Sequence, residues 1–310
     1  LSLKKSLRSR LASMGANEVL TYSFVHGEVM NKVGQDNDLA FKLSNALSPQ
    51  LQYYRLSLTP NLLNLVHANS KSGHDSFALF ELGKVHTKSD LDEQGLPTEF
   101  PCLAMVRSDK SSSTAAYFTV RAYLDQLIDH TFSYEKLEAR HFEHSRRLQQ
   151  LIAPYEASRS AAVVREGEMV GVVGEFKTSV MKSFKLPAST AGFEILLSAL
   201  SQSRQKSYVP LSKYPGISQD ICLELSSETD YATVKDALEG VIQARQSGED
   251  DLAVESDLID IYAPPEGTVT RYTFRLKFVS YSHTLQEKVI TREVDNVAQE
   301  MQRSLGAQRI

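Results

Sequence analysis

Arg271-Tyr-Thr-Phe-Arg-Leu-Lys-Phe-Val279 alternates strictly between apolar and polar side chains. Because successive residues of a strand point to opposite faces of a sheet, this pattern predicts a strand with one buried face. The buried set is Tyr272, Phe274, Leu276 and Phe278. The outward set contains three cations, Arg271, Arg275 and Lys277. We expect this strand to lie centrally in an antiparallel sheet that leaves one face open.

Strands and helices are mixed in the predicted sequence of elements around this strand. Strands are predicted at Ile217–Leu225, Leu258–Tyr262 and Arg271–Val279, helices at Tyr231–Ala244 and Glu287–Leu305, and a short last strand at Ala307–Ile310. Both helices carry apolar residues at three- and four-residue spacing, and Gly306 follows the second as a C-terminal signal. The order βαββαβ predicts a ferredoxin-like domain.

The first two hundred residues mix helices and strands without the regular alternation of a parallel sheet. Helices are expected at Leu3–Met14, Pro60–Ala68 and Phe118–His130, and strands at Glu18–Phe24, Phe77–His86 and within Ala161–Phe176, with a polar loop at Ser108–Thr114. The pattern indicates an α+β domain on an antiparallel sheet. The aperiodic polar run Ser201–Ser207 predicts a linker, which places the two domains at 1–205 and 206–310.

Composition limits the class of protein. The 310 residues are 42% apolar and 23% charged, which is ordinary for a globular chain with two cores. No apolar run approaches the ~20 residues of a membrane span, and no signal peptide opens the chain. Cys102 and Cys222 lie in apolar, strand-like runs, which predicts buried free thiols in a reducing cytoplasm. The chain begins at Leu1, and we expect a piece of a longer protein.

Charge is spread unevenly along the chain. The net charge of −4 does not indicate a nucleic-acid binder. From residue 212 to the C-terminus there are 10 basic and 17 acidic residues, yet residues 271–310 alone hold 7 basic and 4 acidic. Any RNA contact here must therefore use a local basic face against an acidic background.

The outward cations of the alternating strand have two interpretations. Tyr262 is expected on the same open face, and an aromatic ring beside a row of cations suits an unstacked base and its phosphates. The alternative is a solvated face whose cations only balance Asp220, Glu224 and Asp260 across the strands. The pattern alone favours this alternative, because charged sheet faces are common.

Five short motifs resemble a known domain in their order and spacing. They are Tyr214-Pro-Gly-Ile-Ser-Gln-Asp220, Ile259-Asp-Ile-Tyr262, Phe274-Arg-Leu-Lys-Phe278, Thr284-Leu285 and Leu305-Gly-Ala307. Together they resemble the ferredoxin-fold anticodon-binding domain that closes the β subunit of bacterial phenylalanyl-tRNA synthetases. The resemblance implies an RNA-binding set of Tyr214, Tyr262, Arg271, Arg275 and Lys277. Gln219 and Ile310 replace two arginines of the family pattern, which removes a cation from the expected RNA face.

The first part of the chain is similar to the core of the same β subunit. The matching motifs are Glu18–Phe24, Leu43–Ser48, Tyr54–Pro60, Phe80–Val85, Tyr117–Arg121, Gly174–Phe176 and Phe193–Ile195. In that family the core is a class II aminoacyl-tRNA synthetase-like antiparallel sheet domain that does no aminoacylation. The resemblance implies an α subunit partner in an α2β2 heterotetramer and tRNA(Phe) as the RNA. ATP and Mg2+ would serve the complete enzyme and not this part, and neither DNA nor a membrane is expected as a partner.

Catalytic residues are not expected in this chain. A class II site needs an arginine after the aromatic of its second motif, where this chain has Glu81, a charge that would repel a triphosphate. It also needs a glycine-rich third motif, where this chain has Gly192-Phe-Glu-Ile-Leu-Leu-Ser198. Two interpretations remain open for Arg55. It lies in a matched family motif, but it could serve only in a structural ion pair. His141-Phe-Glu-His144 lacks a neighbouring cysteine, which favours a surface loop over a zinc site.

Two other classes of protein fit part of the pattern. A single-chain organellar synthetase carries the same anticodon domain, but it must keep the catalytic arginines and the glycine-rich turn. A stand-alone ferredoxin-like regulatory module needs no RNA. Binding of tRNA by residues 211–310 distinguishes such a module from a β subunit.

Overall fold

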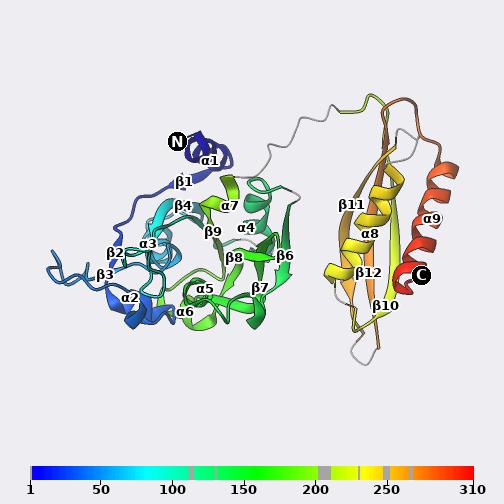
Figure 1. Cartoon of the computed structure of the whole chain (residues 1–310). Coiled ribbons are helices and arrows are strands. Elements are labelled where there is room, and N and C mark those ends of the chain that lie inside the picture. The colour runs from blue at the N-terminus through cyan, green and yellow to red at the C-terminus, as the bar shows by residue number, and fades with distance from the viewer. Residues whose placement is uncertain are drawn as a thin grey trace. The chain divides into compact units, whose positions relative to one another are not determined.

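The computed structural model forms two compact units, Leu1–Lys206 and Ser207–Ile310, coloured blue through green and yellow through red in Figure 1. It describes residues 2–111, 115–129, 131–201, 211–229, 231–246, 252–264 and 268–310. The predicted boundary at 205/206, and all of the predicted linker except its first residue, lie outside these ranges. Within them, no helix has both the length and the apolar character needed to cross a membrane.

The first unit is built on a seven-stranded sheet. Its strands, in spatial order, are β1 (Ala16–Glu18), β4 (Ser76–Val85), β5 (Phe100–Asp109), β9 (Ser189–Leu196), β8 (Glu168–Phe176), β7 (Tyr155–Arg165) and β6 (Phe132–Lys136). The short β1 runs parallel to β4, and the other neighbours in this sheet are antiparallel. The predicted α+β class with an antiparallel sheet is confirmed.

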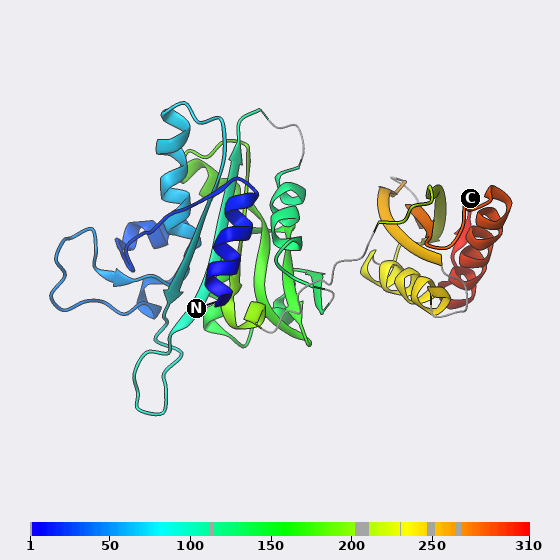
Figure 2. The same cartoon turned by 90° about the horizontal axis from the view of Figure 1, so that it is seen from above.

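Helices cover both faces of this sheet (Figure 2). Alternate residues of β5 show the division, because Cys102 and Ala104 belong to one core and Leu103 and Met105 to the other. The first core holds residues of α3 (Thr59–Lys71), α5 (Arg146–Ile152) and α6 (Thr178–Ser183). The second holds residues of α1 (Ser2–Ser13), α4 (Ala116–Asp125) and α7 (Leu197–Ser201).

A satellite core lies beside the main sheet. Val25, Met30, Ala40 and Leu56 are buried together there. The elements around it are α2 (Gly27–Lys32), the two-stranded sheet of β2 (Phe24–Val25) and β3 (Tyr53–Tyr54), and the 3-10 turn Asn37–Leu39. A second 3-10 turn, Ala139–His141, follows β6.

Three predictions for the first unit are wrong in part. The segment Glu18–Phe24 is not one strand, because β1 ends at Glu18 and Thr21 turns into a buried polar network. The helix predicted at Phe118–His130 ends at Asp125. The predicted loop Ser108–Thr114 begins later, because Ser108 and Asp109 are buried in β5 and residues 112–114 lie outside the described ranges.

The second unit has the predicted ferredoxin-like order. Its antiparallel sheet runs β11 (Leu252–Tyr262), β12 (Val269–Ser280), β10 (Ile217–Ser226) and β13 (Gln308–Arg309), which places β12 centrally as expected. Helices α8 (Tyr231–Gln246) and α9 (Glu287–Leu305) lie on one face (Figure 2). Tyr272, Phe274, Leu276 and Phe278 are buried under them, as the alternating pattern predicted.

Two glycines of this unit should respond oppositely to the same substitution. Gly306 ends α9 at φ 69°, in the left-handed region, whereas Gly240 is an exposed residue of α8 where a Cβ meets nothing within 4 Å. Gly306→Ala should lower the free energy of unfolding by about 1 kcal/mol. Gly240→Ala should raise it by about 0.5–1 kcal/mol.

Hydrogen exchange of the β12 amides in the whole chain measures both effects without interference from the first unit. We expect protection to fall in the first variant and to rise in the second. Equal shifts in the two variants would contradict the left-handed C-cap at residue 306.

Candidate RNA-binding face and the buried network of the core

The predicted cations lie on the face of the second sheet that the helices leave open. Arg271 stands opposite Glu224 of β10, and Arg275 stands opposite Asp220. Lys277 stands opposite Glu255 of β11. Because the intervening residues of β12 are buried under α8 and α9, these side chains must point the other way. The three cations therefore form a row about 20 Å long.

A bulge in β11 turns Tyr262 toward this open face. Before the bulge, Asp257 is paired with Arg275. The register shifts between Leu258 and Asp260, and after it Tyr262 pairs with Arg271. One extra residue reverses the alternation of a strand, so an unbulged β11 would direct Tyr262 toward the helices. The ring is 50% exposed, with the Arg271 guanidinium 6.0 Å from its centroid.

Each of the three cations has an acidic partner. Arg275 donates from Nε and Nη2 to the two carboxylate oxygens of Asp220, at 2.8 and 2.9 Å. Arg271 Nε donates to Glu224 at 2.8 Å, and Lys277 Nζ lies 3.5 Å from Glu255. The hydrogen bonds from Arg275 lower the pKa of Asp220, and those to Glu224 and Asp220 raise the pKa values of Arg271 and Arg275.

The predicted balancing of charge is thus confirmed for Asp220 and Glu224, but not for Asp260. Asp260 stands opposite Thr273 instead of a cation. Two acidic residues of the open face, Glu255 and Asp257, were missed because the strand was predicted to begin only at Leu258. Their period-two spacing in Glu255-Ser-Asp257 was a signal that could have extended the strand.

Tyr214 lies at the opposite end of the sheet from Tyr262. It precedes β10, whose first residue Ile217 pairs with Phe278 at the Lys277 end of β12. Tyr262 is paired at the opposite end, beside Arg271. Tyr214 is half-buried, and its backbone N–H donates to Ser212 Oγ at 3.0 Å. The structure therefore brings Tyr262 together with Arg271 and leaves Tyr214 at the Lys277 end of the sheet.

The two family arginines that are replaced here occupy different sides of the sheet. Gln219 faces the helices, and its Nε2 donates to Thr291 of α9 at 3.1 Å. An arginine at position 219 would also lie on the helix side, so the cation expected to be lost from the open face is not the one that Gln219 replaces. Ile310 follows β13 with its N–H bonded to the Cys222 carbonyl, and Cys222 lies on the open side of β10. Cys102 is buried as predicted, but Cys222 is only half-buried.

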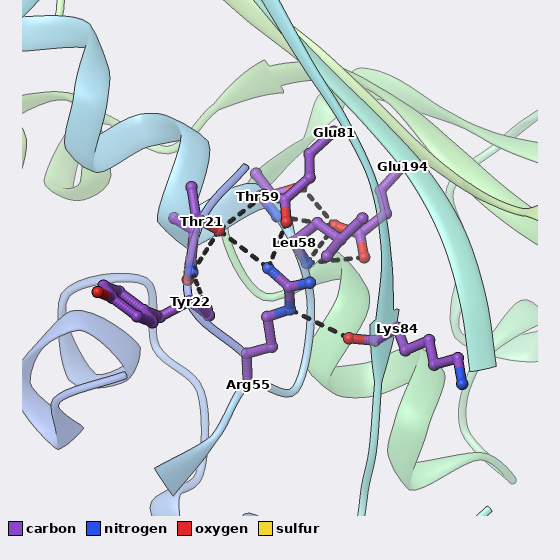
Figure 3. A network of polar contacts seen from close by, with 9 residues as sticks. Thr21, Tyr22, Arg55, Leu58, Thr59, Glu81, Lys84 and Glu194 are labelled. Carbon is purple, nitrogen blue, oxygen red and sulfur yellow. Dashed lines mark hydrogen bonds and ion pairs between the residues drawn. The ribbon is translucent and has the colours of Figure 1, made fainter. Parts of the chain in front are cut away.

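A buried ion pair lies in the interior of the first unit (Figure 3). Arg55 Nη1 donates to Glu81 at 2.8 Å and to Thr21 Oγ1 at 2.9 Å, and its Nε donates to the Lys84 carbonyl at 3.0 Å. The two charged side chains are 4% and 3% exposed. A Cβ on Gly83 would lie 2.3 Å from Arg55 Nη2, so only glycine leaves room for the guanidinium. Of the two roles open to Arg55, the structure shows the ion pair.

Glu194 is a second buried charge in the same region (Figure 3). Its carboxylate accepts from the N–H groups of Leu58 and Thr59, both at 2.9 Å, and from the Thr59 hydroxyl at 2.7 Å. It therefore caps the first turn of α3 from a neighbouring strand. Burial raises the pKa of Glu194, and these hydrogen bonds oppose that rise.

A small cavity lies beside Glu194 in the first unit. It is bordered by Leu56, Cys102, Arg147 and Glu194 and has a volume of about 10 Å³, about the space of one water. Ligand pockets occupy roughly 300–1,000 Å³. Glu81 is turned to Arg55 and paired with it. The expected repulsion of a triphosphate by Glu81 remains a prediction.

The histidines at 141 and 144 have separate partners. His141 Nδ1 accepts from the Glu138 N–H at 3.2 Å, and Nε2 lies 3.0 Å from Glu135. His144 is 91% exposed beside Glu143. Across the described ranges, no group of three His, Cys, Asp or Glu residues could hold a metal ion.

Comparison with protein families gives two matches along the chain. Residues 1–197 match the phenylalanyl tRNA synthetase beta chain CLM domain. The chain belongs to this family. Residues 212–309 match the ferredoxin-fold anticodon binding domain, which covers the open face described above.

Several bacterial relatives are similar over almost the whole chain. Phenylalanine–tRNA ligase beta subunits from Syntrophus aciditrophicus and Vibrio cholerae are 25% and 26% identical to it over 98% of its length. The chain spans only 38% and 37% of those proteins. A solved pyrrolysyl tRNA synthetase from Desulfitobacterium hafniense has a TM-score of 0.47 and 15% identity, over 67% of this chain and 73% of its own.

The buried pair of this family member can be tested by a double-mutant cycle. Arg55→Met leaves the Glu81 carboxylate buried without its partner and should lower the free energy of unfolding by about 3–5 kcal/mol. Arg55→Met/Glu81→Met removes both charges and should recover more than half of that loss. Hydrogen exchange of the β4 and β5 amides measures each value. A double variant as unstable as the single one would show that packing, and not the unpaired charge, causes the loss.

Proposed function

We propose that this chain is part of a phenylalanyl-tRNA synthetase β subunit, in which it binds tRNA(Phe) and supports a catalytic α subunit. The second unit binds the anticodon region through Tyr262, Arg271, Arg275 and Lys277, with Tyr214 at the edge of the contact. The observation that carries this proposal is the row of cations ending at a half-exposed tyrosine, on the uncovered face of an anticodon-binding fold.

The chemistry of this face suits a single-stranded loop. Unstacked bases of RNA are bound on aromatic rings, and their phosphates are bound by lysine and arginine. The ion pairs of Arg271, Arg275 and Lys277 are all accessible to water, and exposed pairs of this kind exchange partners readily. A phosphate can therefore compete with the carboxylates for the cations.

The first unit is a scaffold in this proposal. Its interior is occupied by the Arg55–Glu81 pair and by Glu194, so amino-acid activation with ATP and Mg2+ belongs to the α subunit. The two subunits form an α2β2 heterotetramer in the cytoplasm. The beta-subunit relatives support a partner subunit, and the α2β2 arrangement is the form that the family resemblance implies.

Removing the cations and removing the tyrosine ring should change the affinity and the salt dependence of tRNA binding in different ways. In Arg275→Ala/Lys277→Ala, each lost phosphate contact should reduce the salt slope of tRNA binding by about 0.7. In Tyr262→Ala, the loss of stacking should weaken binding by about 1–3 kcal/mol with less change in the slope. Fluorescence anisotropy with labelled tRNA(Phe) over a salt series measures both quantities.

The matched control is Lys288→Ala/Arg292→Ala, which removes the same charge from exposed residues of α9. It should bind tRNA like the parent. In the enzyme reconstituted with its α subunit, the open-face variants should raise the KM for tRNA and leave adenylate formation unchanged. Parental binding by both open-face variants would refute the proposed RNA face.

A further inference from the structure

The open face carries more negative than positive charge. Among the described residues of β10, β11 and β12, three cations share it with five carboxylates, those of Asp220, Glu224, Glu255, Asp257 and Asp260. A surface that binds RNA mainly through phosphates would be expected to show the opposite excess. The excess therefore needs a physical explanation of its own.

We propose that Asp220 and Glu224 are specificity-determining residues, which occupy Arg275 and Arg271 so that phosphate alone binds this face poorly. This inference rests on the proposed function, RNA binding at the open face. RNA displaces the carboxylates only when a further contact, an unstacked base on Tyr262, offsets the loss of the ion pairs. The carboxylates thereby exclude RNA that cannot supply such a base.

The geometry of the arginine contacts supports this competition. Asp220 takes Nε and Nη2 of Arg275, which is the edge of the guanidinium that binds a phosphate through two parallel hydrogen bonds. Glu224 takes Nε of Arg271. A phosphate that binds the Nε side of either guanidinium must displace a carboxylate. The displaced carboxylate stays on the neighbouring strand, directly opposite the arginine, and continues to repel the phosphate.

The ion pair between Asp220 and Arg275 is both charged and exposed to solvent. The hydrogen bonds from Arg275 keep the pKa of Asp220 below its ordinary value, so the carboxylate stays charged near neutral pH. The Asp220 and Arg275 side chains are 43% and 50% exposed, so the pair lies within reach of a dissolved polyanion. At physiological pH the carboxylate therefore always competes with phosphate for the arginine, and a dissolved ligand can still displace it.

Tyr262 supplies the contact that the carboxylates do not oppose. Its ring is neutral and half-exposed, and the register places it at the Arg271 end of the cation row. Bases inside a double helix are stacked on each other and cannot lie on the ring, whereas bases of a single-stranded loop can. Duplex RNA of equal charge should therefore bind this face more weakly than an anticodon loop.

The test removes the two carboxylates without changing the size of the side chains. Asp220→Asn/Glu224→Gln in the full chain should bind a 20-base-pair RNA duplex more tightly, by on the order of tenfold at 0.1 M salt. Affinity for tRNA(Phe) should rise less, so the ratio between tRNA(Phe) binding and duplex binding should fall. The salt slope for the duplex should become steeper.

The matched control is Asp295→Asn/Glu300→Gln on α9. It also removes one aspartate and one glutamate that are paired with arginines, Arg309 and Arg303, but on the helix side. This variant should bind the duplex and tRNA(Phe) like the parent. A similar gain in the control would show that net charge alone, and not the open face, limits non-specific binding, which would overturn the inference.

The remaining outcomes are also decisive. Unchanged or weaker binding of the duplex to the open-face variant, with β12 amide protection intact, would overturn the inference. If protection is lost, the single variants Asp220→Asn and Glu224→Gln are measured instead, each with about half the effect on the logarithm of affinity. Loss of tRNA binding in Arg275→Ala/Lys277→Ala alongside an unchanged open-face variant would leave the proposed function standing and remove only this inference.

Discussion

A sheet covered by helices on one side must turn alternate residues of every strand toward water, and this constraint shapes the second unit. The helices α8 and α9 bury one residue in two along β12, so the arginines and the lysine between them have no other place than the open face. The same rule applies to β10 and β11. Most of their acidic residues therefore lie opposite the cations on the neighbouring strands. The open face carries these paired charges, with the Tyr262 ring at one end.

In the first unit the sheet has no open face. Helices cover both faces of its sheet, so a polar residue in the interior must find a partner inside the protein. Arg55 finds Glu81, and Glu194 finds the first turn of α3. These contacts satisfy the buried polar groups inside the first unit. Burial on two sides thus leaves the charged residues paired in the interior, whereas burial on one side leaves charged residues on an open surface.

The sequence predicted the features that depend on local periodicity. The buried face of β12, the central place of that strand and the two helices all follow from spacing of two, three and four residues. Contacts between distant residues carry no such signal, and nothing in the sequence joins Arg55 to Glu81 across 26 positions. The bulge between Leu258 and Asp260 was also hidden, because Ile259 is as apolar as an ordinary strand residue. The side of Gln219 can be predicted from its alternation with Asp220, which lies on the open face.

The most direct test maps where RNA lies on the second unit. The anticodon stem-loop of tRNA(Phe) is titrated into the isotope-labelled chain, and the backbone amides, the tyrosine rings and the arginine Nε–H signals are followed by NMR. We expect the Tyr262 ring and the Nε–H groups of Arg271 and Arg275 to shift, with little change along α8 and α9. Shifts confined to the helices or to the first unit would contradict an RNA-binding role for the open face.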